Sequence, residues 1–165
     1  MELTVRLKRV GDLFNNLPDT ANAIVNYLLG TRGVPALSFA VAKLPPTVNH
    51  AYIRTRWNTR LSEEYLEFKK MVDHSIQLSR NNFKIRATAA VVILLESPRW
   101  VTKKNTIRQM DADNRVKTVL DAVQDSLQIP DETNWEIHVY KIASTKEQTT
   151  CFIFDLGEVV SYHCS

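Results

Sequence analysis

Two aspartates one residue apart begin the acidic part of the stretch RQMDADNRVKTVLDAVQDSL, residues 108–127, which has arginine and lysine on both sides. Carboxylates as close as those of Asp111 and Asp113 repel each other unless a cation lies between them or one takes a proton. A hard divalent ion such as Mg²⁺ suits oxygen ligands and can stabilise the charge that develops on a phosphate during hydrolysis. The pair therefore indicates a candidate metal site for phosphodiester chemistry.

The residues after this pair have the period of an amphipathic helix. One buried stripe is expected at Val116, Val119, Leu120, Val123 and Leu127. Asp113, Lys117 and Asp121 form a second row beside that stripe, one turn apart from each other. Lys117 could hold the scissile phosphate or assist the leaving oxygen.

A further acidic pair, Asp131 and Glu132, follows the helix across a turn, and one of the two could complete the metal shell. A second interpretation needs no metal. The first two aspartates could be N-cap and first-turn acids that favour the helix dipole, and Lys117 with Asp121 could be an ordinary exposed ion pair. The stretch also lacks the glycine and the spacing of a calcium-binding EF-hand loop.

Basic residues gather in two other segments. The segment YIRTRWNTR contains Arg54, Arg56 and Arg60 beside Tyr52 and Trp57, without an acidic residue. This combination suits contacts to phosphate and stacking on bases, although such arginines often belong to a solvated loop. The second segment precedes the acidic pair and supplies Lys103, Lys104 and Arg108.

The composition fits one domain with a single core. The chain has 165 residues, 44% hydrophobic content and a net charge of +3, which is weak evidence for nucleic acid by itself. Cys151 lies in an apolar run and Cys164 near the end of the chain, so a buried thiol and a terminal thiol are expected rather than a disulfide or a zinc site. Because no signal peptide or membrane span is recognisable, a cytoplasmic location without membrane partners is expected.

Hydrophobic periodicity predicts an α+β domain, with a mixed β-sheet flanked by α-helices. Strands are expected at residues 2–8, 36–44, 85–96, 135–143 and 149–156, and helices at 20–29, 62–78 and after the acidic pair. Gly30 is expected to end the first helix, and Pro45 with Pro46 to force an extended loop. We expect an N-terminal extension at 1–36, with a strand and a helix, a main domain at 37–157 and a tail at 158–165.

Read in order, these pieces resemble the RusA family of Holliday-junction resolvases. Residues 37 to about 143 carry the resemblance. Its first element is a Pro-Pro-x-x-Asn start followed by Tyr and a basic loop, matched by Pro45, Pro46, Asn49 and Tyr52. Its second element is D-x-D-N-x-x-K-x-x-x-D-A with an acidic pair about ten residues later, matched by Asp111, Asp113, Asn114, Lys117, Asp121, Ala122, Asp131 and Glu132.

The resemblance implies a homodimeric endonuclease that depends on Mg²⁺, with Mn²⁺ as a possible substitute, and makes paired, symmetrical nicks in four-way DNA junctions. It implies that Asp111, Asp113 and Glu132 bind the metal, with Asp131 as an alternate ligand, and that Lys117 is needed for cleavage. The second member of the acidic pair is usually Asp in this family. The extra methylene of Glu132 shifts its carboxylate by more than about an ångström, which could affect the rate.

The function expected from the sequence is therefore resolution of branched DNA in recombination and repair. The DNA backbone would contact Arg54, Arg56, Arg60, Lys103, Lys104, Arg108 and Asn114. Two alternatives remain open. The chain could be a catalytically silent nucleic-acid-binding protein that kept the fold, or a metal nuclease that acts on fork or flap DNA.

Overall fold

The computed structural model describes residues 19–79, 85–104, 106, 108 and 112–157. Four sequence expectations lie outside these residues: the strand at 2–8, the position of Asp111, the thiol of Cys164 and the tail at 158–165. No helix within the described ranges is long and apolar enough to cross a membrane.

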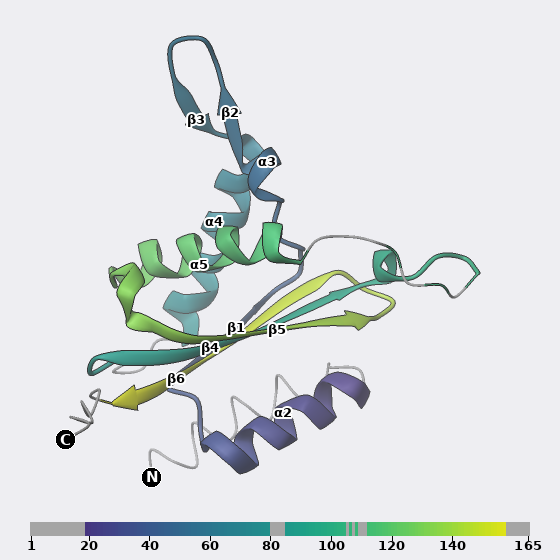
Figure 1. The fold of residues 1–165 in the computed structure, drawn as a ribbon, viewed down its shortest axis with the longest axis vertical. Coiled ribbons are helices and arrows are strands. Elements are labelled where there is room, and N and C mark those ends of the chain that lie inside the picture. The colour runs from purple at the N-terminus through teal and green to yellow at the C-terminus, as the bar shows by residue number, and fades with distance from the viewer. Residues whose placement is uncertain (1–18, 80–84, 105, 107, 109–111, 158–165) are drawn as a thin grey trace, which may run out of the picture.

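The centre of the fold is a four-stranded mixed sheet (Figure 1). Its strands are β1 (Leu37–Val41), β4 (Thr88–Ser97), β5 (Asn134–Ala143) and β6 (Gln148–Gly157), in the spatial order β1-β6-β4-β5. Strands β4 and β5 are parallel, whereas β6 is antiparallel to both of its neighbours. Parallel neighbours need a long crossover connection, and the one from β4 to β5 carries a helix. The predicted α+β class with a mixed sheet is confirmed.

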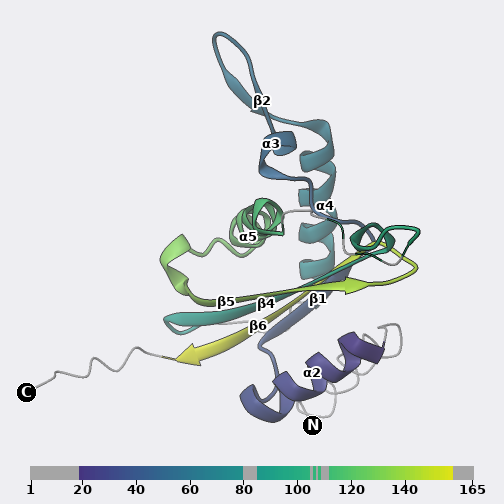
Figure 2. The same cartoon turned by 45° about the vertical axis from the view of Figure 1, so that its right-hand side comes forward.

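Helices cover both faces of this sheet (Figures 1 and 2). Helices α4 (Glu63–Ser79) and α5 (Asp113–Leu127) lie on one face, and α2 (Asp19–Arg32) lies on the other. A 3₁₀ turn, η1 (Pro98–Trp100), directly follows β4. A second one, η2 (Asp131–Thr133), directly precedes β5. Because β4 is buried along its whole length, its continuous apolar run matches a strand covered on both sides.

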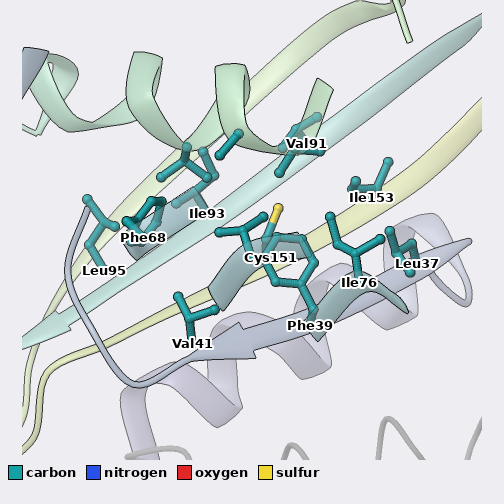
Figure 3. Close-up of a cluster of buried hydrophobic side chains, with 14 of the residues drawn as sticks. Leu37, Phe39, Val41, Phe68, Ile76, Val91, Ile93, Leu95, Cys151 and Ile153 are labelled. Carbon is teal, nitrogen blue, oxygen red and sulfur yellow. The ribbon is translucent and has the colours of Figure 1, made fainter. Parts of the chain in front are cut away.

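Helix α4, expected at residues 62–78, has a side-chain cap at its start and one buried stripe. The hydroxyl of Ser62 accepts a hydrogen bond from the backbone N–H of Tyr65 at 3.2 Å, which is N-cap geometry. The residues buried along the helix are Tyr65, Phe68, Val72 and Ile76. Together with Leu37, Phe39, Val41, Val91, Ile93, Leu95, Cys151 and Ile153, members of this stripe form the main core (Figure 3). The expected burial of the Cys151 thiol is confirmed.

Helix α2 extends beyond its predicted end. Gly30 lies inside the helix, and Gly33, at φ 77°, follows its last residue and donates its N–H to the carbonyl of Leu29 at 3.0 Å. The expected stop at Gly30 is therefore wrong, because the left-handed conformation that ends the helix occurs at the second glycine. Ala21, Val25 and Leu28 pack on the second face of the sheet. This part of the N-terminal extension thus covers the sheet.

Residues 45–61 do not form the extended loop that the two prolines suggested. A short helix, α3 (Val48–Ala51), leads directly into an antiparallel hairpin of β2 (Tyr52–Arg54) and β3 (Thr59–Leu61). The hairpin projects away from the sheet and the helices in both views (Figures 1 and 2). Its ends are fixed because the N–H of Ser62 donates to the carbonyl of Ala51 at 2.8 Å.

Candidate active site

Helix α5 carries the row of charged residues, and its orientation differs slightly from the predicted one. Ala112 occupies the N-cap position without a side-chain hydrogen bond, and Asp113 is the exposed first residue of the helix. The residues buried on α5 are Thr118, Val119, Ala122, Val123, Gln124 and Leu127. Val116 and Leu120, predicted within the stripe, are only partly buried. The helix is therefore rotated relative to the prediction, so that Val116 and Leu120 lie at the edge of its buried face.

This edge forms one wall of a groove of about 570 Å³ between α5 and β5. The residues that line the groove are Ala112, Asp113, Val116, Lys117, Leu120, Asp121, Gln124, Ile137 and Val139. The row of Asp113, Lys117 and Asp121 thus lies along one concave surface, as the helical spacing predicts. The opposite wall is apolar and belongs to β5, which is an edge strand.

Asp121 connects this row to the segment that begins with the two prolines. The ammonium group of Lys117 lies 3.4 Å from one oxygen of Asp121, and the hydroxyl of Tyr52 donates to the other at 3.2 Å. Burial, followed by the nearby charge of Asp121, raises the pKa of the Tyr52 phenol above its usual value. Tyr52 therefore stays a neutral donor, and it orients the carboxylate that faces Lys117.

The two prolines dock onto the same helix through their carbonyl groups. The Arg115 guanidinium donates to the carbonyl of Pro45, and the Thr118 hydroxyl donates to that of Pro46 at 2.8 Å. Burial, with the neighbouring charge of Arg99, lowers the pKa of Arg115. Sequence reasoning missed Arg115 and Thr118. The available signal was a threonine inside the apolar stripe, since a buried hydroxyl needs a partner.

These contacts join the two motifs, Pro45–Tyr52 and Asp113–Ala122, into one structural unit. A scan against protein-family models matches residues 43–153 to the family described as Endodeoxyribonuclease RusA. The chain belongs to the RusA family of endodeoxyribonucleases. The match spans more than half of the chain and includes both motifs. No curated protein sequence matches this chain at a significant level.

The RusA-family match begins after α2 and β1, which the structure nevertheless builds into the domain. Strand β1 pairs with β6 from Leu37↔Ile153 to Val41↔Thr149, and α2 buries apolar residues against the sheet. At the C-terminal end of α2, the guanidinium of Arg32 forms a salt bridge with the carboxylate of Glu136 on β5, at 2.5 Å between Nη2 and Oε2. The matched region of this chain therefore packs against a helix and a strand that lie outside the match.

The predicted carboxylate ligands do not all lie at one end of α5. Asp113 begins the helix, whereas Glu132 lies in η2, beyond its C-terminal end. The rise from Asp113 to Leu127 is about 21 Å at 1.5 Å per residue. Asp111 and the side chain of Asp131 lie outside the described residues, and the described part of the chain contains no cluster of three potential metal ligands. Within one chain, the helix thus keeps Asp113 and Glu132 apart.

The predicted DNA-contacting residues lie on the hairpin and on the loop before α5. Arg54, Arg56, Arg60, Lys103, Lys104 and Arg108 are all exposed, and Asn114 is half-buried in the first turn of α5. The loop is anchored by Trp100, which is buried and donates its indole N–H to the carbonyl of Leu95 at 2.6 Å. The N–H of Arg108 donates to the carbonyl of Trp100 at 2.9 Å. Both basic segments are therefore tied to elements that pack around α5.

Proposed function

We propose that this chain is a Mg²⁺-dependent endonuclease that makes paired nicks in four-way DNA junctions during recombination and repair. The observation that carries the proposal is the groove beside α5. It contains Asp113, Lys117 and Asp121 of the RusA-family motif on one wall, and Asp121 is bonded to Tyr52 of the other motif. Family membership supports endonuclease chemistry, and the charged row in the groove supports placing that chemistry beside α5.

Asp113 suits a magnesium ligand because its carboxylate is exposed at the start of α5 and offers the oxygen donors that hard cations prefer. Asp111, two residues earlier in the sequence, would be its companion ligand, and Mn²⁺ would substitute for Mg²⁺. When bound, the ion activates a water and stabilises charge on the phosphate. Asp113 lines the groove and would hold the ion there.

Lys117 is positioned to contact the scissile phosphate. It lies one helical turn from Asp113 and is held at 3.4 Å from Asp121. The exposed side chain remains free to extend toward a phosphate, because an exposed i,i+4 ion pair is weak. Lys117 therefore holds the phosphate or donates a proton to the leaving oxygen, and Asp121 orients its ammonium group.

A homodimer follows from the geometry of a four-way junction, since two opposed strands must be cut together and a two-fold protein matches a two-fold substrate. The dimer also accounts for the separation of Asp113 and Glu132. If two α5–β5 edges meet antiparallel, the start of one α5 lies beside the end of the other. The apolar wall of the groove supports this arrangement, since Ile137 is 44% exposed there. Glu132 of the partner subunit would then complete the metal site.

Cleavage of a defined set of DNA substrates tests the activity. Purified protein is incubated with a labelled four-way junction, a fork and a linear duplex, first with Mg²⁺ and then with EDTA. Nicking of the junction that disappears in EDTA supports the proposal. Binding without cleavage identifies a silent DNA-binding protein, and faster cleavage of the fork identifies a nuclease of different substrate.

Mixing two inactive variants tests whether the metal site is shared between subunits. In a heterodimer of Asp113→Asn and Glu132→Gln, a shared arrangement leaves one of the two sites with both native carboxylates. The mixture should therefore nick one strand of the junction, although each variant alone is inactive. If the ligands act within one chain, both sites of the heterodimer are damaged and no nicking is recovered. The two variants carry different affinity tags, and successive purification on both tags isolates the heterodimer for the assay.

A further inference from the structure

The turn of the β2–β3 hairpin carries an aromatic residue, Trp57, that has no role in the proposed cleavage reaction. Trp57 is 86% exposed at the tip of the hairpin, which projects away from the rest of the protein (Figure 2). A tryptophan side chain can bury about 150–250 Å² in an interface or a core, so its exposure is unfavourable in water. The residues between Ile53 and Arg60 are likewise all exposed. The tip is therefore not held in place by packing against the domain.

The turn that carries Trp57 is nevertheless well ordered by its own hydrogen bonds. The N–H of Thr55 donates to the carbonyl of Asn58 at 2.8 Å, and the N–H of Asn58 donates to the hydroxyl of Thr55 at 3.0 Å. The amide oxygen of Asn58 accepts from the N–H of Thr59 at 2.7 Å. These bonds fix the backbone on both sides of Arg56 and Trp57. The indole is thus presented at the apex before any ligand arrives, which lowers the entropy cost of binding.

The charges around the indole suit a nucleic acid. The guanidinium carbon of Arg56 lies 5.0 Å from the centre of the Trp57 ring, within the range of a cation–π contact. Arg54 pairs with Thr59 and Arg60 with Ile53, so their side chains leave the hairpin on opposite faces. None of these three arginines forms a salt bridge within the part of the chain that the structure describes. A polyanion can therefore contact the hairpin on either face of its tip.

The base of the hairpin is rigidly joined to the candidate active site. Tyr52, the first residue of β2, donates to Asp121 on α5, and its ring lies 6.0 Å from that of Tyr65 on α4. The hairpin therefore cannot pivot freely with respect to Lys117 and Asp113.

We infer that Trp57 stacks on an exposed base face of branched DNA and so favours branched over linear substrates. The inference rests on the proposed action on branched DNA. Linear duplex buries its base faces in the stack, whereas a branch point exposes the faces of the terminal base pairs of its arms, and single strands expose every base. An indole stacks on any base because each has a π-face. The arginines then neutralise the phosphates beside it.

Binding measured in EDTA tests this role without any cleavage. The probes are a four-way junction with 2-aminopurine next to the branch point, a linear duplex with internal 2-aminopurine, and a single strand. The proteins are wild type, Trp57→Ala, Trp57→Phe and the control Tyr27→Ala, which removes an aromatic residue that is 68% exposed on α2. Anisotropy gives the dissociation constants, and the 2-aminopurine fluorescence reports stacking at the labelled base.

Trp57→Ala should weaken junction binding about tenfold, which is the range of one base–aromatic stack, and should abolish the 2-aminopurine response. Duplex binding and the salt dependence of binding should stay unchanged, because no phosphate contact is lost. Trp57→Phe should retain most of the junction affinity, and Tyr27→Ala all of it. Weakened binding to the single strand as well would identify unpaired bases as the ligand, and weakened junction binding alone would identify the branch point.

Junction affinity and fluorescence that persist in Trp57→Ala would overturn the inference, as would an equal loss on duplex and junction. Equal thermal unfolding midpoints for wild type and Trp57→Ala show that the change is local to the tip. Failure of the proposed junction cleavage is seen separately, in the Mg²⁺ assay with wild-type protein. The binding assay therefore decides the role of Trp57 whether or not the chain cuts junctions.

Discussion

The Tyr52 hydroxyl donates to the Asp121 carboxylate at 3.2 Å, so the hairpin and the charged helix α5 are joined by side chains 69 positions apart in the sequence. Tyr52→Phe removes this bond and leaves the ring in place. We expect a loss of about 1 kcal/mol in unfolding free energy, the usual net value of one hydrogen bond. Single-turnover cleavage should also slow, because the Asp121 carboxylate loses the donor that orients it toward Lys117. Urea unfolding and a cleavage time course measure the two effects.

Asp113→Asn should separate DNA binding from cleavage. The amide keeps the size of the side chain but removes the negative charge that a divalent ion needs. Cleavage should fall by more than about 100-fold, because loss of a ligand costs more than loss of an outer-shell partner. Junction binding in EDTA should be at least as tight as that of wild type, since one repulsion toward phosphate is removed. Cleavage at the wild-type rate would show that the metal site lies elsewhere.

Arg54→Gln should reduce the salt dependence of DNA binding. If Arg54 contacts one phosphate, the slope of log K against log salt should decrease in magnitude by about 0.9. The matched control is Arg86→Gln, an exposed arginine before β4 that pairs with Asp155 at 2.9 Å. Its slope should equal that of wild type. Anisotropy titrations at several salt concentrations provide the measurement, and an unchanged slope for Arg54→Gln would remove the hairpin from the DNA surface.

Glu96 should make the protein less stable as pH rises. Its side chain is fully buried, and burial raises its pKa in the folded state, opposed by Lys146 and a hydrogen bond with Ser144. The folded state therefore holds this proton more tightly than the unfolded chain, and stability falls as pH rises above the unfolded pKa toward the folded one. Glu96→Gln should be more stable than wild type at pH 7 and should lose this pH dependence. Urea unfolding between pH 4 and 8 tests both points.

Leu28→Ala should show that α2 is part of the domain. Leu28 is 3% exposed and packs on the sheet with Val25 and Phe152. Truncation of such a residue costs about 3 kcal/mol. Tyr27→Ala, next to it but exposed, should change stability by less than about 0.5 kcal/mol. Chemical unfolding of both variants gives the comparison, and a single transition in each would place α2 in the same cooperative unit as the sheet.

Elements whose cause is local could be predicted from the amino-acid sequence alone. The apolar run of β4, the Ser62 cap and stripe of α4, and the row of Asp113, Lys117 and Asp121 follow from periodicity and capping chemistry within one segment. The order of the two motifs along the chain was also sufficient to predict the RusA family. The predicted helix end at Gly30 was wrong because two glycines lie near the end of α2. Only the positive φ of Gly33 shows which of them ends the helix.

Features that depend on contacts between residues distant in sequence became visible only in the folded protein. It placed the carbonyls of Pro45 and Pro46 on α5, joined Tyr52 to Asp121, and converted an expected loop into a projecting hairpin with Trp57 at its apex. It also separated Asp113 from Glu132 by the length of a helix. No spacing rule predicts such relationships, because they arise when separate elements pack together and their buried polar groups form hydrogen bonds with each other.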